Sequence, residues 1–253
     1  MWEHFPYIKL KIPFRDFERL PQHPAYRYEF WGGFARMDGR PKVYHATRPI
    51  VRSRPPETVE RPRDGGLVRF RPLKEEDWND LPELMLRAFR EVPPFAQLRP
   101  AKALAAAEDC MGKVRAGKEG PLIPEACFVA ESAVGTGRAS GDEPILIGAV
   151  LLTRHTRHRT WLDQDYKSHG GEERPHLTWA MTRRWDARAG IGTALLQLAM
   201  NALDDAGDRE LDSTFMAGNS GSMLWHWRNG FAVMPFILGE RALRTRLDDE
   251  SCE

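Results

Sequence analysis

Cysteine is scarce in this sequence, and neither sign of charge is in excess. Only Cys110, Cys127 and Cys252 occur in 253 residues, far apart and in no metal-ligand spacing. This sparse, odd count argues against a disulfide framework and fits a reducing compartment. Lys and Arg number 37 against 36 Asp and Glu, which leaves a formal net charge of +1. That balance argues against binding nucleic acid through bulk charge, which needs clustered basic residues.

Long apolar runs are absent as well. No window approaches the ~20 apolar residues that a membrane-spanning helix needs, so we expect no membrane partner. The first residues, MWEHFP, lack a basic region followed by an apolar stretch, so we expect no signal peptide and a cytoplasmic protein. Hydrophobic residues make up 42% of the chain, which is enough to form a core.

The first 52 residues predict a small β-rich extension. Residues 26–31 (YRYEFW) and 34–37 (FARM) flank Gly32 and Gly33, a pattern typical of a two-residue hairpin turn. Residues 41–47 are expected to add a third strand to this unit. Residues 53–66 are rich in Arg, Pro, Glu and Gly, which predicts a linker.

The rest of the chain, residues 67–245, predicts one mixed α/β domain whose central sheet is flanked by helices. An alternating strand at 67–72 precedes an amphipathic helix at 78–89 and an Ala-rich helix at 101–116. Continuous apolar runs at 126–130 and 145–152 are typical of buried strands. A long polar loop is expected at 155–175, before a strand, a glycine turn, a helix, a strand, a helix and a strand. An acidic tail, 246–253, ends the sequence.

A glycine-rich turn follows the apolar segment 176–181. Gly190 and Gly192 stand where a strand is expected to feed a helix, and glycines there let the backbone approach a phosphate. The first N–H groups of the helix can then bind the phosphate. Two alternatives remain at this point: a tight turn without a ligand, or a site for ATP or a dinucleotide in an unrelated enzyme.

A second motif follows at 219–231 (NSGSMLWHWRNGF). With the glycine turn, this region resembles the GNAT superfamily of acetyl-CoA-dependent N-acetyltransferases. Its members carry Arg/Gln-x-x-Gly-x-Gly/Ala and, in many cases, Asn-x-x-Ala-x-x-x-Tyr-x-x-x-Gly-Phe. Here Ala187 stands at the basic position, with Arg188 one residue later, and His226 stands at the tyrosine position.

The resemblance implies an N-acetyltransferase that moves the acetyl group of acetyl-CoA directly to an amine in a ternary complex. It implies that the sheet splays between strands 145–152 and 177–181, with the pantetheine arm of CoA in that gap. Arg184 and Arg188 would supply countercharge, and Trp227, or alternatively Trp225, would pack on the pantetheine. The expected cofactor-binding residues are Trp179, Met181, Arg184, Arg188, Ala189, Gly190, Ile191, Gly192, Thr193, Ala194, Asn219 and Trp227.

The catalytic expectations rest on the same resemblance. His226 would take the tyrosine's role and protonate the departing thiolate, since histidine can donate a proton near neutral pH. Packing beneath a helix is the alternative for His226, and helix capping is the alternative for Asn219 at the thioester end. The general base stays open among Glu131, which we carry as the candidate, and the alternatives Glu91, Asp212 and Ser213.

Two further interpretations concern metals and partners. His155, His158, His169 and His176 cluster in the expected polar loop, but without cysteines or tightly spaced acids we expect a solvated loop and no metal. The expected partner is a small-molecule or peptide amine, and the aromatic hairpin invites a homodimer. A rival function is a non-catalytic acyl-CoA-binding or sensing module that acts through a protein partner.

Overall fold

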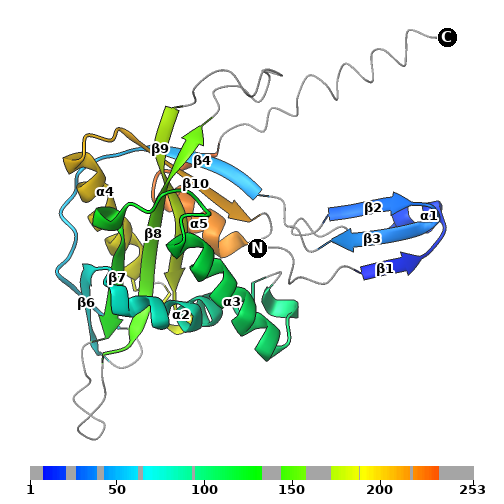
Figure 1. The fold of residues 1–253 in the computed structure, drawn as a ribbon, viewed down its shortest axis with the longest axis horizontal. Coiled ribbons are helices and arrows are strands. Elements are labelled where there is room, and N and C mark those ends of the chain that lie inside the picture. Colours follow the sequence, from blue (N-terminus) through cyan, green and yellow to red (C-terminus); the bar gives the residue numbers. More distant parts are fainter. Residues whose placement is uncertain are drawn as a thin grey trace, which may run out of the picture.

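The computed structural model describes residues 8–20, 27–38, 43–61, 65–92, 95–132, 144–157, 172–187, 189–216 and 219–233. These residues form two sheets (Figure 1). The smaller has three strands in the order β1-β3-β2, and the larger has eight in the order β11-β4-β10-β9-β8-β7-β6-β5.

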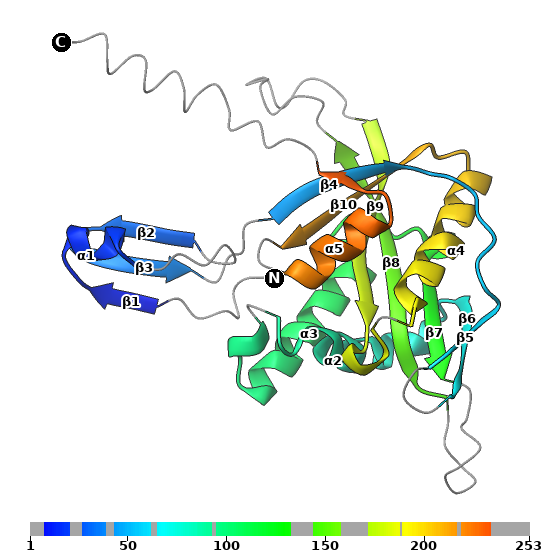
Figure 2. The same cartoon turned by 180° about the vertical axis from the view of Figure 1, so that it is seen from behind.

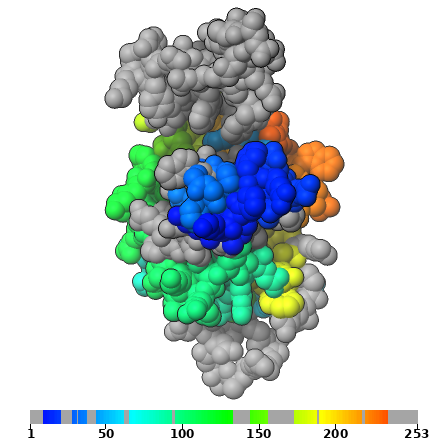
Figure 3. All heavy atoms as spheres, turned by 90° about the vertical axis from the view of Figure 1, so that its right-hand side faces the viewer, coloured from blue at the N-terminus to red at the C-terminus, as the bar shows by residue number. Residues whose placement is uncertain are grey.

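The small sheet contains the predicted hairpin. Strands β2 (Arg27–Trp31) and β3 (Phe34–Asp38) pair antiparallel, and β1 (Ile8–Lys11) pairs with β3. Gly32 and Gly33 form the turn with φ of 58° and 81°, angles that glycine adopts readily. Helix α1 (Phe14–Glu18) packs on the sheet through Phe14, 5.3 Å from the ring of Phe30. Figure 3 looks onto this unit from its outer side.

Strand β4 (Val43–Pro49) corrects the expected organisation. It pairs with β10 (Glu210–Met216) along its whole length and with the short β11 (Ala232–Val233) on its other side. The prediction that residues 41–47 add the third strand of the small unit is therefore wrong, because β1 has that place. The main sheet gains a strand from the N-terminal part of the chain, and Ala46 is fully buried there.

Four of the remaining main-sheet strands follow the predicted order: β6 (Leu67–Pro72), β7 (Phe128–Ser132), β8 (Leu146–Arg157) and β9 (Glu172–Thr182). The fifth, β5 (Thr58–Glu60), was not predicted, because it lies within residues 53–66, which were expected to form a linker. The loop expected at 155–175 is shorter than predicted, since β8 and β9 extend into it and pair as far as Arg157 and Glu172. His155 and His176 consequently lie in strands, whereas His158 and His169 fall outside the described residues.

Helices cover both faces of the main sheet. Figures 1 and 2, seen from opposite sides, show α2 (Leu81–Phe89) and α3 (Pro100–Arg115) on one face and α4 (Ile191–Asp205) and α5 (Ser220–Arg228) on the other. The core between them includes Leu84, Leu151 and Leu195, each almost fully buried. Short 3-10 helices span Glu75–Asn79, Phe95–Gln97, Pro124–Ala126 and Arg184–Asp186. No described helix is long and apolar enough to cross a membrane.

Candidate functional site

The main sheet loses its pairing at one place, between β9 and β10. These parallel strands pair only at Asp212 with His176 and at Ser213 with Leu177. Strand β9 continues to Thr182 and β10 to Met216, without further pairing between their described residues. We call the unpaired stretch, residues 178–182 of β9 and 214–216 of β10, the seam. Unpaired strand backbone can add an extended ligand as if it were another strand.

The expected splay between 145–152 and 177–181 is wrong. Those segments lie in β8 and β9, which pair continuously from Gly148 with Thr182 to Arg157 with Glu172, apart from one register shift at Leu151/Leu152. Antiparallel strands joined directly in sequence remain hydrogen-bonded, whereas β9 and β10 are parallel and connected through helix α4.

The register decides which backbone groups of β9 face the seam. The N–H of Arg183 donates to the carbonyl of Ile147 in the continuation of β8, at 2.8 Å. Backbone groups alternate in direction along a strand, so those of Met181 and Trp179 also turn toward β8. The groups of Ala180 and Thr182 turn toward the seam. The expected cofactor-binding residues Trp179 and Met181 therefore have their backbone groups paired with β8, away from the seam.

Helix α4 begins at the open end of the seam. Gly190 precedes it with φ of 82°, and no described side chain caps its first turn. The N–H of Ala194 already donates to the carbonyl of Gly190 at 2.9 Å, so the N–H groups of Ile191, Gly192 and Thr193 are the ones that remain for a ligand. A Cβ atom built on Gly190 would meet nothing within 4 Å, which shows open space in front of this turn.

Trp225 of α5 lies against Gly192 in the first turn of α4. A Cβ atom on Gly192 would lie 3.1 Å from the indole Nε1 of Trp225 and 3.4 Å from the hydroxyl of Thr182. Gly192 therefore has a packing role as well as the predicted binding role. Trp227 is 73% exposed and lies elsewhere, in the wall of a cavity described below.

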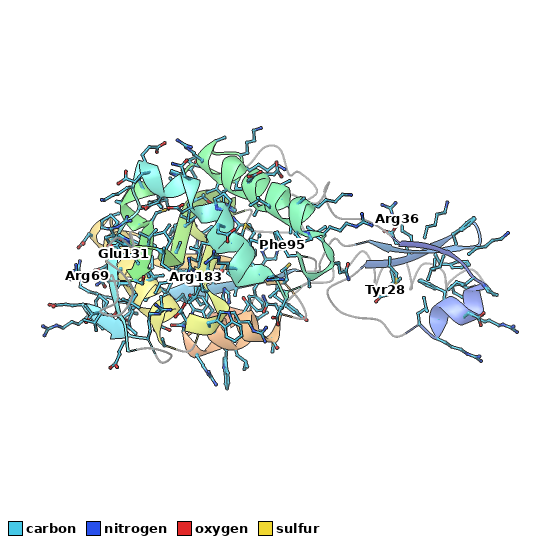
Figure 4. The ribbon with its side chains drawn as sticks, turned by 90° about the horizontal axis from the view of Figure 1, so that it is seen from below. Tyr28, Arg36, Arg69, Phe95, Glu131 and Arg183 are labelled. Atoms are coloured by element: carbon cyan, nitrogen blue, oxygen red, sulfur yellow. The ribbon has the colours of Figure 1, made fainter. Side chains whose placement is uncertain are left out.

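Among the predicted arginines, Arg184 is exposed and pairs with Glu91, and Arg188 falls outside the described residues. Arg183 is more strongly enclosed. Its Nε atom is buried without a hydrogen-bond partner among the described residues. Burial, with Arg87 and Arg61 nearby, lowers the pKa of Arg183. Figure 4 shows Arg183 in the main unit, on the side of Arg69 and Glu131 and away from Tyr28 and Arg36.

His226 lies beneath α5 with both ring nitrogens occupied. Its Nδ1 is 2.8 Å from the carbonyl oxygen of Ser222, and its Nε2 is 2.9 Å from the hydroxyl of Ser213. Because a carbonyl only accepts, Nδ1 carries the proton and Nε2 accepts from Ser213. Burial lowers the pKa of His226, so the ring is neutral near pH 7 and its single proton is committed to Ser222. This geometry favours the packing alternative.

Asn219 caps helix α5. Its side-chain oxygen accepts a hydrogen bond from the N–H of Ser222 at 3.1 Å. Ser222 also contributes the carbonyl that accepts from His226. The second motif thus builds a local structure in which the cap and the buried histidine share one residue.

Glu131 lies in an ion network on β6 and β7. It accepts from Arg71 at 2.8 Å, and Arg71 also holds Asp77 with two bonds of 2.7 and 2.8 Å. Burial pushes the pKa of Asp77 upward, but Arg71 and the N–H of Lys74 outweigh this effect and hold it below its usual value. Strands β8 and β9 separate Glu131 from β10. The structure therefore does not bring Glu131 together with His226 and Asn219.

A cavity of about 260 Å³ lies between β10, α5 and β11. His226 and Trp227 are among its lining residues, with apolar side chains from β10, α5 and β11: Phe215, Met223, Leu224, Phe231 and Val233. Within the described residues, no three His, Cys, Asp or Glu side chains are placed to hold a metal ion.

Comparisons with known proteins gave similarity in structure only. No family model matches the chain, and no curated protein matches it in sequence. A GCN5-related N-acetyltransferase from Sphaerobacter thermophilus is similar with a TM-score of 0.48 and 15% identity. The match covers 90% of this chain and 56% of that one.

Two solved structures with CoA are also similar. The PaiA N-acetyltransferase of Thermoplasma acidophilum has a TM-score of 0.42 and 15% identity, over 66% of this chain and 91% of that chain. The aminoglycoside N-acetyltransferase AAC(6')-Iy has a TM-score of 0.44 and 15% identity, over 70% and 95%.

Proposed function

We propose that this protein is a GNAT-type N-acetyltransferase that moves an acetyl group from acetyl-CoA to an amine within a ternary complex. One observation carries the proposal: the unpaired strand edge of the seam leads directly to the uncapped first turn of α4. An extended amide-bearing chain ending in a pyrophosphate matches both features, and CoA has that chemistry. The two sequence motifs border this same place.

The pantetheine amides would pair with the backbone of Ala180 and Thr182. The pyrophosphate would accept hydrogen bonds from Ile191, Gly192 and Thr193, where the helix dipole also favours an anion. Ala189 and Gly190 form the turn beneath it, and Arg183, which lies between β9 and this turn in the chain, would supply countercharge together with Arg184 and Arg188. The thioester would then lie near the last paired residues, Ser213 and Leu177.

The second candidate is a non-catalytic acyl-CoA-binding module. The position of His226 favours it, because a neutral ring whose proton is bound to Ser222 does not offer that proton to a thiolate. Both candidates require acetyl-CoA in the seam. They differ in turnover: only the enzyme releases CoA faster when an amine is present.

Thermal unfolding with acetyl-CoA, beside ATP and NAD, tests the shared part of the proposal. A ligand at about 100 times its dissociation constant stabilises the folded state by roughly 2.7 kcal/mol. For a chain of this length we expect a rise of roughly 5–10 °C with acetyl-CoA alone. An equal rise with ATP, or no rise with acetyl-CoA, would contradict the assignment.

Gly190→Glu provides the matched variant. The new carboxylate would project into the open space before α4 and repel pyrophosphate, so the rise should disappear. Gly207→Glu is the control, since Gly207 follows the other end of α4 with φ of 85° and also meets nothing within 4 Å. We expect Gly207→Glu to retain the full rise.

A further inference from the structure

Polar side chains follow one another across four strands at the closed end of the seam. In register, Thr47 of β4 lies opposite Asp212 of β10, Asp212 beside His176 of β9, and His176 opposite Thr153 of β8. Residues opposite one another share a face of the sheet. Trp179 and His176 lie opposite Leu151 and Thr153, which are two residues apart in β8 and so share a face. This is the face of α2, because Trp179 contacts the ring of Phe89 at 5.7 Å. We call Thr47, Asp212, His176 and Trp179 the apex cluster.

Three polar atoms of the apex cluster are buried without a hydrogen-bond partner in the described part of the chain. They are Oγ1 of Thr47, Nε2 of His176 and Nε1 of Trp179. Leaving such an atom unsatisfied costs about 1–3 kcal/mol. Native structures contain few of these atoms, so three in neighbouring strands indicate a polar occupant.

His176 offers an acceptor rather than a charge. It is only 6% exposed, and its ring stacks on His155 at 4.1 Å. Burial first, then the nearby histidines His155, His45 and His226, lower its pKa to about 3. The neutral ring can donate from Nδ1 to the hydroxyl of Thr178 at 3.2 Å, which leaves a lone pair on Nε2.

We propose that Asp212 and His176 bind the ammonium group of the acceptor amine, and that Asp212 is the general base of the transfer. This inference rests on the proposed function and names its acceptor as a primary amine. A primary ammonium carries only N–H donors, which suit the carboxylate of Asp212 and the lone pair of His176. A carboxylate or phosphate group at this position would be repelled.

The proposed acetyl transfer begins with loss of a proton from the ammonium group. The ammonium gives one proton to the carboxylate of Asp212, and the amine lone pair then forms a C–N bond with the thioester carbon. The C–S bond breaks, and its electron pair leaves on the CoA sulfur. The new amide nitrogen loses a second proton, which neutralises the departing CoA thiolate, and Asp212 releases the first proton to solvent. The products are the N-acetyl amide, CoA thiol and one proton. The indole N–H of Trp179 can donate to the carbonyl oxygen of the acyl group.

Binding of small head groups tests the inference without knowledge of the natural acceptor. Butylamine, butanol and butyrate share one chain and differ in the head group. Each is titrated against the protein with and without saturating CoA, and unfolding temperature is recorded. We expect stabilisation by butylamine only. No stabilisation, or equal effects of butanol and butyrate, would overturn the inference.

Single substitutions test whether butylamine binds at Asp212. Asp212→Asn keeps the shape of the side chain and should weaken butylamine binding about 10-fold or more, because hydrogen bonds to charged groups are the strong ones. Asp208→Asn, whose parent carboxylate pairs with Arg154 at 2.6 Å, is the matched control and should bind butylamine like the wild type. Unchanged binding by Asp212→Asn would place the amine elsewhere and contradict the assignment.

Two outcomes separate this inference from the proposed function. If acetyl-CoA stabilises the protein but butylamine does not, the apex cluster holds water and only this inference fails. If acetyl-CoA does not stabilise the protein, the proposed function fails. In transfer assays, Asp212→Asn should lower kcat at least 10-fold while acetyl-CoA affinity stays unchanged; loss of that affinity would indicate a structural role instead.

Discussion

Burial of the single residue His176 makes the free energy of unfolding depend on pH. Its pKa of about 3 in the folded protein lies below the ordinary value of about 6.5. Between these values the unfolded chain holds a proton that the folded chain lacks. The contribution of neutral His176 to the free energy of unfolding is therefore complete above pH 6.5. It declines by about 1.4 kcal/mol per pH unit as the pH falls toward 3.

We expect the free energy of unfolding to fall when the pH is lowered from 7.5 to 5. His176→Phe retains a ring to stack on His155 but cannot take up the proton, so its decline should be smaller. Urea unfolding at the two pH values measures both slopes. Equal slopes in wild type and variant would show that His176 does not titrate as described.

Some of the motif residues could be interpreted from the sequence alone, and others could not. Gly190 was recognised because a close approach of the backbone to a phosphate needs glycine, and its φ of 82° adds a second reason. For His226 the sequence left two roles open, and for Glu131 it did not show the ion network, because Ser213 and Arg71 meet these side chains only in the folded sheet. Asp212 was one of several possible bases until the register placed it beside His176.

Among the secondary-structure elements, helix α5 depends on a side-chain cap at its N-terminus. Its start depends on Asn219, which accepts from the N–H of Ser222. We expect Asn219→Ala to lower the free energy of unfolding by about 1 kcal/mol, and Asn219→Asp, which keeps the acceptor oxygen, to lower it much less. Urea unfolding measures both. Equal losses in the two variants would show that the cap contributes nothing.

Elements were predictable where helix propensity is high or an apolar run is continuous, but the pairing of strands was not. The Ala-rich pattern at 101–116 predicted α3, which spans Pro100–Arg115, and the apolar run at 145–152 predicted part of β8. The seam was not predicted because the pairing between β9 and β10 depends on how α4, the helix that connects them, packs on the sheet. No local pattern encodes that packing.

At the scale of the whole molecule, β4 ties the N-terminal part of the chain to the main sheet. It fills the place between β10 and β11, so we propose that the boundary of the small unit lies nearer residue 40 than residue 52. A strand was expected at 41–47 because this segment follows the hairpin strands closely in the sequence. That expectation did not show which sheet the strand joins.

Two truncations test this boundary. Removal of residues 1–40 should leave the unfolding midpoint and acetyl-CoA stabilisation of the main sheet close to those of the full chain. Removal of residues 1–52 also deletes β4 and exposes the edges of β10 and β11, so cooperative unfolding should be lost. Similar behaviour of the two truncations would contradict the role given to β4.

Hydrogen exchange of backbone amides, measured with and without acetyl-CoA, shows which part of the protein the ligand contacts. If acetyl-CoA lies in the seam, exchange should slow at Ala180 and Thr182 and in the first turn of α4, Ile191 to Thr193. The small sheet should not change. Protection confined to the cavity between β10, α5 and β11, or no protection in the seam, would contradict binding of acetyl-CoA in the seam.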